Sequence, residues 1–131
     1  MIDIEPEVTA NVKKRLPAGV HFSATYQPRP AKFPHVSAEE TANSVYAKTQ
    51  DSASLENHAS VGYEVNIYSN KEGGKKTEAR ALLAVVDAGM AEMGFSRIYC
   101  QPIPNLADAT VYRIVARYAA VVDNEHRIYQ K

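Results

Sequence analysis

The stretch that most constrains the fold lies between residues 57 and 93. Within 58–69 every second residue is apolar, namely Ala59, Val61, Tyr63, Val65 and Ile67. This period of two predicts a strand that buries one face. Within 75–93 the apolar residues recur every three or four positions, which predicts a helix with one buried stripe. A Gly73-Gly74 turn joins the two, so strand, turn and helix form one unit against which the other segments pack.

Shorter patterns on either side of this unit complete the predicted order of elements. They are a helix over 5–16, strands over 20–24 and 33–40, the strand and helix just described, and strands over 95–101 and 108–122. Pro17 ends the first helix, and Gly94 suits the left-handed position that ends the second. The order α-β-β-β-α-β-β predicts an α+β fold: a mixed, mostly antiparallel sheet with two helices packed on it. We expect one domain over 1–131.

The composition of two segments is compatible with more than one structure. Residues 41–57 are mostly small and polar, and are expected to form a long exposed connection, with a short strand at 43–48 as a further option. A connection of this length is either functional or a tolerated surface insertion. Residues 125–131 either add a last strand to the sheet or form an unpaired C-terminal segment.

Composition restricts the class of protein. The 131 residues contain 15 basic and 15 acidic side chains, so the formal net charge is zero. A neutral chain lacks the electrostatic signature of nucleic-acid binding or of attachment to an anionic membrane. The first residues lack the pattern of a signal peptide, and no apolar stretch approaches the roughly 20 residues of a membrane span. We therefore expect a protein made in a reducing cytoplasm.

Candidate motifs for chemistry are weak. Residues 73–77 (Gly-Gly-Lys-Lys-Thr) resemble a phosphate-binding loop in position, but lack the glycine spacing of that motif. Cys100, the single cysteine, alternates with Ile98 and is expected to lie on a buried apolar face. The four histidines are too far apart in sequence to suggest a metal site. We predict no catalytic, cofactor-binding or metal-ligating residue, and no enzymatic activity.

Side chains suited to association are more prominent. Eight tyrosines, against three phenylalanines, include several on predicted strands, where they serve either an interface or ordinary strand packing. Arg113 and Arg117 lie on one face of the last long strand, and can pair with Glu64 if the 58–69 strand is a neighbour. Such a pair, if exposed, contributes only about 0–1 kcal/mol.

Four phrases of the sequence carry a resemblance to a known family. They span residues 33–36 (Phe-Pro-His-Val), 57–70, 71–79 and 102–113. The second ends in an aromatic-Ser pair, and the third is a Gly/Lys-rich turn that leads into an Ala/Leu-rich helix. In this order they resemble the tail terminator, or tail-completion, family of phages and prophages with long non-contractile tails. The resemblance extends from the first helix to about Val122, and the 41–57 connection is less typical of that family.

What the resemblance implies is a structural role in the virion. Members form a six-fold ring on the tail tube, stop its polymerisation and offer a surface for joining the head. The implied partners are other copies of the chain, the tube protein and a head–tail connector protein. DNA passes through the ring without sequence-specific binding, and assembly takes place in the host cytoplasm.

Residues predicted to contact these partners come from the two exposed loops and the tyrosine- and arginine-bearing strands. They are Tyr46, Lys48, Tyr63, Lys71, Lys75, Lys76, Arg113, Arg117 and Tyr118. The three lysines of the 70–76 turn either face the lumen or are solvated charges.

Three other functions stay open from the sequence. A head–tail connector or stopper protein is the nearest, since it shares the structural role. A small enzyme would need a pocket with converging titratable groups. A nucleic-acid binder is disfavoured by the neutral charge and by the lack of a basic stripe with interleaved aromatics.

Overall fold

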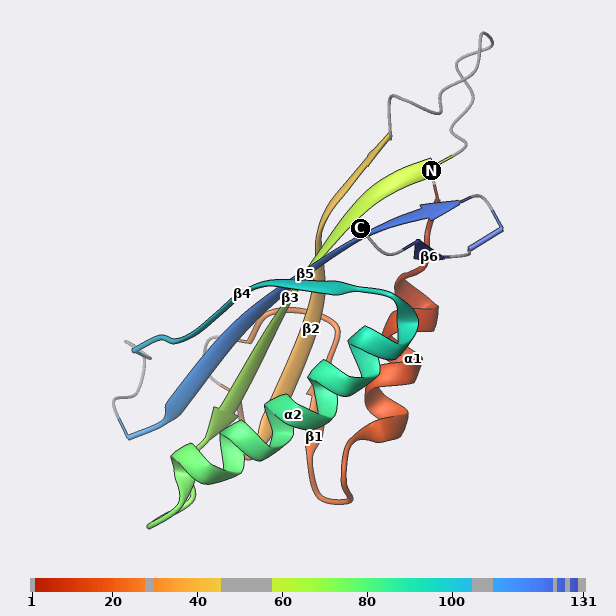
Figure 1. Cartoon of the computed structure of the whole chain (residues 1–131). Helices are drawn as coiled ribbons and strands as arrows, with labels where there is room; N and C mark the ends of the chain where they lie inside the picture. Colours follow the sequence, from red (N-terminus) through yellow and green to blue (C-terminus); the bar gives the residue numbers. More distant parts are fainter. Residues whose placement is uncertain are drawn as a thin grey trace, which may run out of the picture.

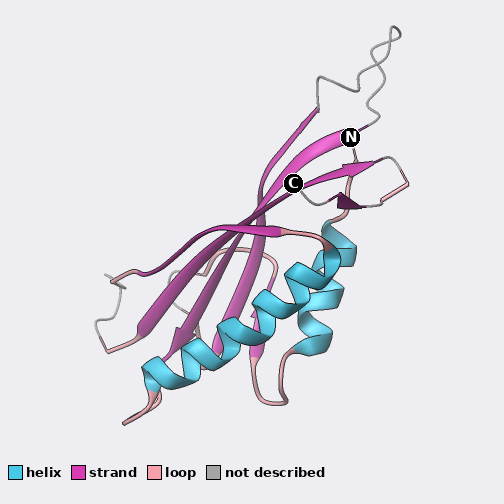
Figure 2. Cartoon of the chain, viewed as in Figure 1, coloured by secondary structure: helices cyan, strands magenta, loops and turns pink. Residues whose placement is uncertain are grey.

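The computed structural model describes residues 2–27, 30–45, 58–104, 110–123, 125–126 and 128–129, without the side chains of Val45 and Tyr129. In these residues the chain forms one six-stranded sheet with both helices on the same face (Figures 1 and 2). The elements are α1 (Glu5–Arg15), β1 (His21–Ser23), β2 (His35–Val45), β3 (His58–Ser69), α2 (Lys75–Met93), β4 (Ser96–Pro102), β5 (Tyr112–Asp123) and β6 (Ile128–Tyr129). The predicted α+β class and the order α-β-β-β-α-β-β are confirmed. For residues 125–131, the alternative of a last strand holds at 128–129, where β6 pairs with β5.

The long strand β3 is at the centre of the sheet. The strand order is β1-β2-β3-β5-β4, and β6 lies beside the end of β5. Among the described strands, β1 and β2 are the one parallel pair, and the other pairs are antiparallel. All twelve residues of β3 pair with β5, from His58 opposite Asp123 to Ser69 opposite Tyr112. The strand–turn–helix unit predicted from the sequence is therefore the part of the fold that contacts most of the rest.

A single core lies between the helices and the near face of the sheet. The alternating side chains of β3 from Ala59 to Ile67 are buried there, as predicted. Helix α1 contributes Val8 and Val12, and α2 contributes Ala79, Leu82, Val86 and Met90. Each fully buried aliphatic side chain of this kind stabilises the fold by about 1.5–3 kcal/mol.

The end of α2 follows the predicted geometry. Gly94 has φ 103°, and the backbone N–H of Phe95 donates to the carbonyl of Met90 at 2.9 Å. The buried ring of Phe95 then meets Tyr63 edge-on, with centroids 5.5 Å apart. The turn thus closes the helix and returns the chain to the core.

Strand β2 is longer than predicted. Residues 41–45, expected to begin an exposed connection, continue β2 and pair with β3, after a bulge between Glu40 and Ala42. The expected loop is wrong for 41–42, whereas the optional strand at 43–48 is confirmed over 43–45, and Thr41, Ala42 and Ser44 are exposed as expected. Polar residues at the margin of a sheet do not show a buried face in the sequence, although their backbone still pairs. Residues 46–57 lie outside the described part of the chain.

The surroundings of Cys100 also differ from the prediction. Cys100 is exposed, and Ile98 keeps 65% of its surface accessible. Strand β4 is at the margin of the sheet, and its register on β5 shifts between Arg97 and Tyr99. Because α2 packs more closely on β3 and β5 than on β4, Cys100 lines an open groove beside the helix, and Ile98 lies at the register shift.

The turn at Gly94 gives a test of this packing. A Cβ at Gly94 would lie 3.0 Å from Cγ2 of Ile128, whereas a Cβ at Gly73 (φ 74°) would meet nothing within 4 Å. We expect Gly73→Ala to lower the free energy of unfolding by about 1 kcal/mol, from the left-handed backbone alone. Gly94→Ala should cost more, up to about 3 kcal/mol. Urea unfolding measures both, and equal losses would contradict the packing of β6 against this turn.

Candidate functional site

The predicted contact residues fall in different environments. Tyr46 and Lys48 lie outside the described residues. Tyr63 and Tyr118 are buried, with 0% and 1% of their surface accessible, so the prediction that they contact a partner is wrong for this conformation. They are cross-strand partners on β3 and β5, and both side chains lie in the core between the sheet and the helices. The amphipathic character of tyrosine suits an interface, but the strand period placed these two in the core.

The two buried tyrosines differ in their hydroxyl groups. The hydroxyl of Tyr118 donates to Oδ1 of Asp87 on α2 at 3.0 Å. The hydroxyl of Tyr63 has no hydrogen-bond partner among the described residues. Burial raises the pKa of both phenols well above the ordinary value of about 10, and nearby carboxylates raise it further. These tyrosines are therefore structural groups.

The two predicted arginines lie on the far face of the sheet, away from the helices. Arg117 approaches Glu64 at 3.9 Å and lies over the ring of Tyr99, 4.9 Å from its centroid. The predicted pairing with Glu64 is thus confirmed for Arg117.

Arg113 has different partners on the same face. It donates to Oδ1 of Asn66 at 2.9 Å. Its guanidinium carbon lies 5.2 Å from the ring centroid of Tyr26 and 5.9 Å from that of Tyr68. The prediction of a Glu64 pair is wrong for Arg113, because the register sets Tyr68 opposite it and Glu64 opposite Arg117. Both guanidinium groups are already engaged within the chain.

The segment before β2 covers part of this far face, which sequence reasoning missed. Tyr26 stacks on Arg113, and Pro30 is buried. His35 keeps 8% of its surface accessible, and its Nε2 lies 3.1 Å from Oγ of Ser23. Burial, with His21 nearby, lowers the pKa of the His35 imidazole. The signal that could have found this cover is the apolar and aromatic content of a proline-rich stretch otherwise interpreted as a simple break.

The three predicted lysines separate in the structure. Lys71 is exposed, and Lys75 donates through Nζ to the carbonyl oxygen of Thr110 at 3.1 Å. Lys76 is exposed at the rim of a groove of about 470 Å³ between α2 and β4. Lys76 lines this groove together with other cations and apolar side chains, whereas Lys71 lines a second, larger cleft.

We call this hollow the basic groove. It is lined by Lys76, Arg80, Leu83, Arg97, Cys100, Pro102, Tyr112 and Ile114. The cations come from α2 and from the first part of β4, and the apolar side chains come from α2, β4 and β5. Such a surface suits an anionic segment with an apolar side chain among its charges.

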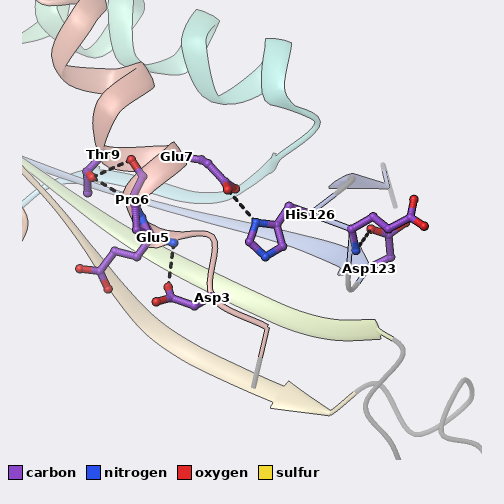
Figure 3. Close-up of polar contacts among 8 residues, drawn as sticks. Asp3, Glu5, Pro6, Glu7, Thr9, Asp123 and His126 are labelled. Atoms are coloured by element: carbon purple, nitrogen blue, oxygen red, sulfur yellow. Dashed lines mark hydrogen bonds and ion pairs between the residues drawn. The ribbon is translucent and has the colours of Figure 1, made fainter.

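A surface of the opposite charge surrounds the start of α1. We call it the acidic patch, and it consists of Asp3, Glu5, Glu7 and Glu40. Oε1 of Glu7 lies 2.6 Å from Nδ1 of His126, and Oδ1 of Asp3 accepts the backbone N–H of Glu5 at 3.1 Å (Figure 3). Burial raises the pKa of Glu40, against a hydrogen bond from Asn43 that lowers it. Sequence reasoning placed two of these acids at a helix start but did not join them to Glu40.

A larger cleft, of about 690 Å³, lies where the α1–β1 turn faces the start of α2. Its polar lining includes Lys71, Thr77 and Glu78, and Oε1 of Glu78 accepts a hydrogen bond from Oγ of Ser69 at 2.7 Å. In the described residues no three His, Cys, Asp or Glu side chains are grouped to hold a metal ion. Neither described helix is long and apolar enough to cross a membrane.

The sequence matches no model of a known protein family and no curated protein. The resemblance to tail terminators therefore stays a prediction. Within the described residues, the surfaces that stand out are the basic groove, the acidic patch and the open margins of the sheet.

Removing the two tyrosine hydroxyls gives a matched pair of variants. Tyr118→Phe should lower the free energy of unfolding by about 1–3 kcal/mol, because it removes a hydrogen bond to a carboxylate. Tyr63→Phe should be neutral or slightly stabilising, because it removes a buried hydroxyl that lacks a protein partner. Denaturant unfolding at neutral pH measures both, and a large loss in Tyr63→Phe would reveal a missing partner.

Alkaline pH gives a second test of the same groups. Since burial raises the pKa of both phenols in the folded state, the unfolded chain releases these protons first as the pH passes about 10. Stability is therefore fully present below that pH and decreases above it. We expect each Phe variant to flatten this decrease, as measured by melting temperature against pH. An unchanged slope would contradict the assignment.

Proposed function

We propose that this chain is the ring-forming tail terminator of a phage or prophage with a long non-contractile tail. In this role it caps the tail tube, stops further polymerisation and provides the surface for head joining. The four sequence phrases and the element order α-β-β-β-α-β-β support the proposal. The role needs no chemistry, and it places the protein at the head-proximal end of the tail.

The observation that carries the proposal is the presence of two different open margins on one sheet. On one side, β4 pairs with β5 and with no other strand that the structure describes. On the other side, β1 pairs with only the first three residues of β2, and the rest of β2 has no outer neighbour among the described strands. Because the two margins differ, copies that join them make a head-to-tail contact, and such a contact closes into a ring when its rotation is right.

The margin formed by β4 also limits unchecked sheet growth. Ile98 lies at the register shift, and Pro102 removes a backbone donor at the end of the strand. A bulge and a proline at a sheet margin disfavour continuous pairing with another chain. Contact through side chains, with a fixed number of copies, fits these features better than an extended fibre.

Oligomer size and tube capping test the proposal together. We expect light scattering to give six times the monomer mass, negative-stain images to show rings, and added protein to shorten polymerising tail tubes. Binding to the portal side and not to tubes would favour the connector alternative. A strict monomer that neither forms rings nor sediments with tubes would overturn the assignment.

A substitution at the open margin makes the test specific. Ile98→Lys adds a charge where β4 is exposed, and Ala84→Lys adds the same charge on the exposed side of α2. Ring formation should fail in the first variant and persist in the second.

A further inference from the structure

The chain is neutral as a whole, yet its charges are separated on the face that carries the helices. The basic groove includes Tyr112, the first residue of β5. The acidic patch contacts His126, whose backbone N–H donates to the carbonyl of Asp123, the last residue of β5. A twelve-residue strand spans about 36 Å at 3.3 Å per residue. The part of the basic groove beside Tyr112 and the acidic patch are therefore too far apart to pair within one copy.

Two cations of the basic groove are available for an external partner. In the described part of the chain, Lys76 and Arg80 are exposed and have no ion pair, whereas Arg97 approaches Asp87 at 3.3 Å. Leu83 and Ile114 line the same hollow. An occupant would have to supply carboxylates together with a small apolar side chain.

The start of α1 has this composition. Glu5 and Glu7 flank Pro6, which is exposed. Oδ1 of Asp3 accepts the backbone N–H of Glu5 at 3.1 Å. Nδ2 of Asn43 ties Glu40 to the same segment, because it donates to Oε1 of Glu40 at 2.9 Å and to the carbonyl of Ile2 at 2.7 Å. The patch therefore gathers negative charge at the start of α1, which a cationic partner surface would complement.

We propose that the acidic patch of one copy binds in the basic groove of the next copy, with Pro6 against the apolar lining of the groove. The contact is head-to-tail because the two surfaces differ. This inference rests on the proposed function for two points, the closure of the contact into a ring and the position of that ring on the phage tail. The contact between two copies does not depend on it. The carboxylates of Glu5 and Glu7 meet Lys76 and Arg80, and opposite charge steers the copies together.

Salt provides the first measurement. The Debye length decreases from about 30 Å at 0.01 M salt to about 3 Å at 1 M. We expect the dissociation constant for self-association of the wild-type protein to rise at least tenfold over this range, as measured by sedimentation velocity. A wild-type protein that stays monomeric at low salt and at the highest attainable concentration would overturn the proposal.

Charge reversal provides the decisive measurement. One variant carries Lys76→Glu and Arg80→Glu, and another carries Glu5→Lys and Glu7→Lys. Each alone should raise the dissociation constant by roughly 100-fold, because like charges would then meet in the contact. An equimolar mixture of the two should restore association, since every contact again joins opposite charges in an alternating ring.

A matched control separates this contact from net charge. Lys13→Glu with Lys14→Glu reverses two exposed cations of α1 that lie outside both surfaces, and should leave association unchanged. Circular dichroism and melting confirm that each variant folds. Equal weakening in the control, or a mixture that fails to associate, would overturn the proposal.

The outcomes for the contact and for the function are distinguishable. If the charge-reversal variants still form rings that cap tubes, the terminator role is supported and this contact is contradicted. Association that follows the charge reversals but gives filaments or dimers without tube capping would retain the contact and reject the terminator role.

Discussion

The fold depends on the antiparallel pairing of β3 with β5. The two strands pair over twelve residues, and this pairing fixes which side chains face the helices. A shift of β5 by one residue along β3 would move Tyr118 from the core to the far face. The register also sets Arg117 opposite Glu64, and Arg113 opposite Tyr68 within reach of Asn66. One backbone ladder thus determines both the core and the polar network behind it.

Coverage of the sheet is uneven, and this leaves its surfaces unlike one another. Helices α1 and α2 cover one face, with α2 mainly over β3 and β5 (Figures 1 and 2). On the other face the segment that carries Tyr26 and Pro30 covers part of the sheet. Neither the helices nor this segment covers the margin formed by β4, so Ile98 and Cys100 are exposed despite their apolar character. Such asymmetry suits a subunit that joins its neighbours through different surfaces.

The zero net charge conceals this polarity. Equal numbers of acidic and basic residues gave no electrostatic signature of a strongly charged partner, and left open whether the charges form local patches. The fold instead gathers acids at the start of α1, near the end of β5, and cations beside the start of β5. A neutral chain can therefore carry two complementary surfaces, which a sum of charges cannot reveal.

Local periodicity in the sequence determined the element order, the bounds of α2, the buried face of β3 and the left-handed end at Gly94. These features depend on residues close together in the chain, where the strand and helix periods act directly. Only the tertiary structure decided that β4 lies at the margin, that Glu40 joins the acids of α1, and that Lys76 and Arg80 share a groove with Arg97. Those outcomes depend on which strands become neighbours, and that choice is made by contacts between residues far apart in sequence.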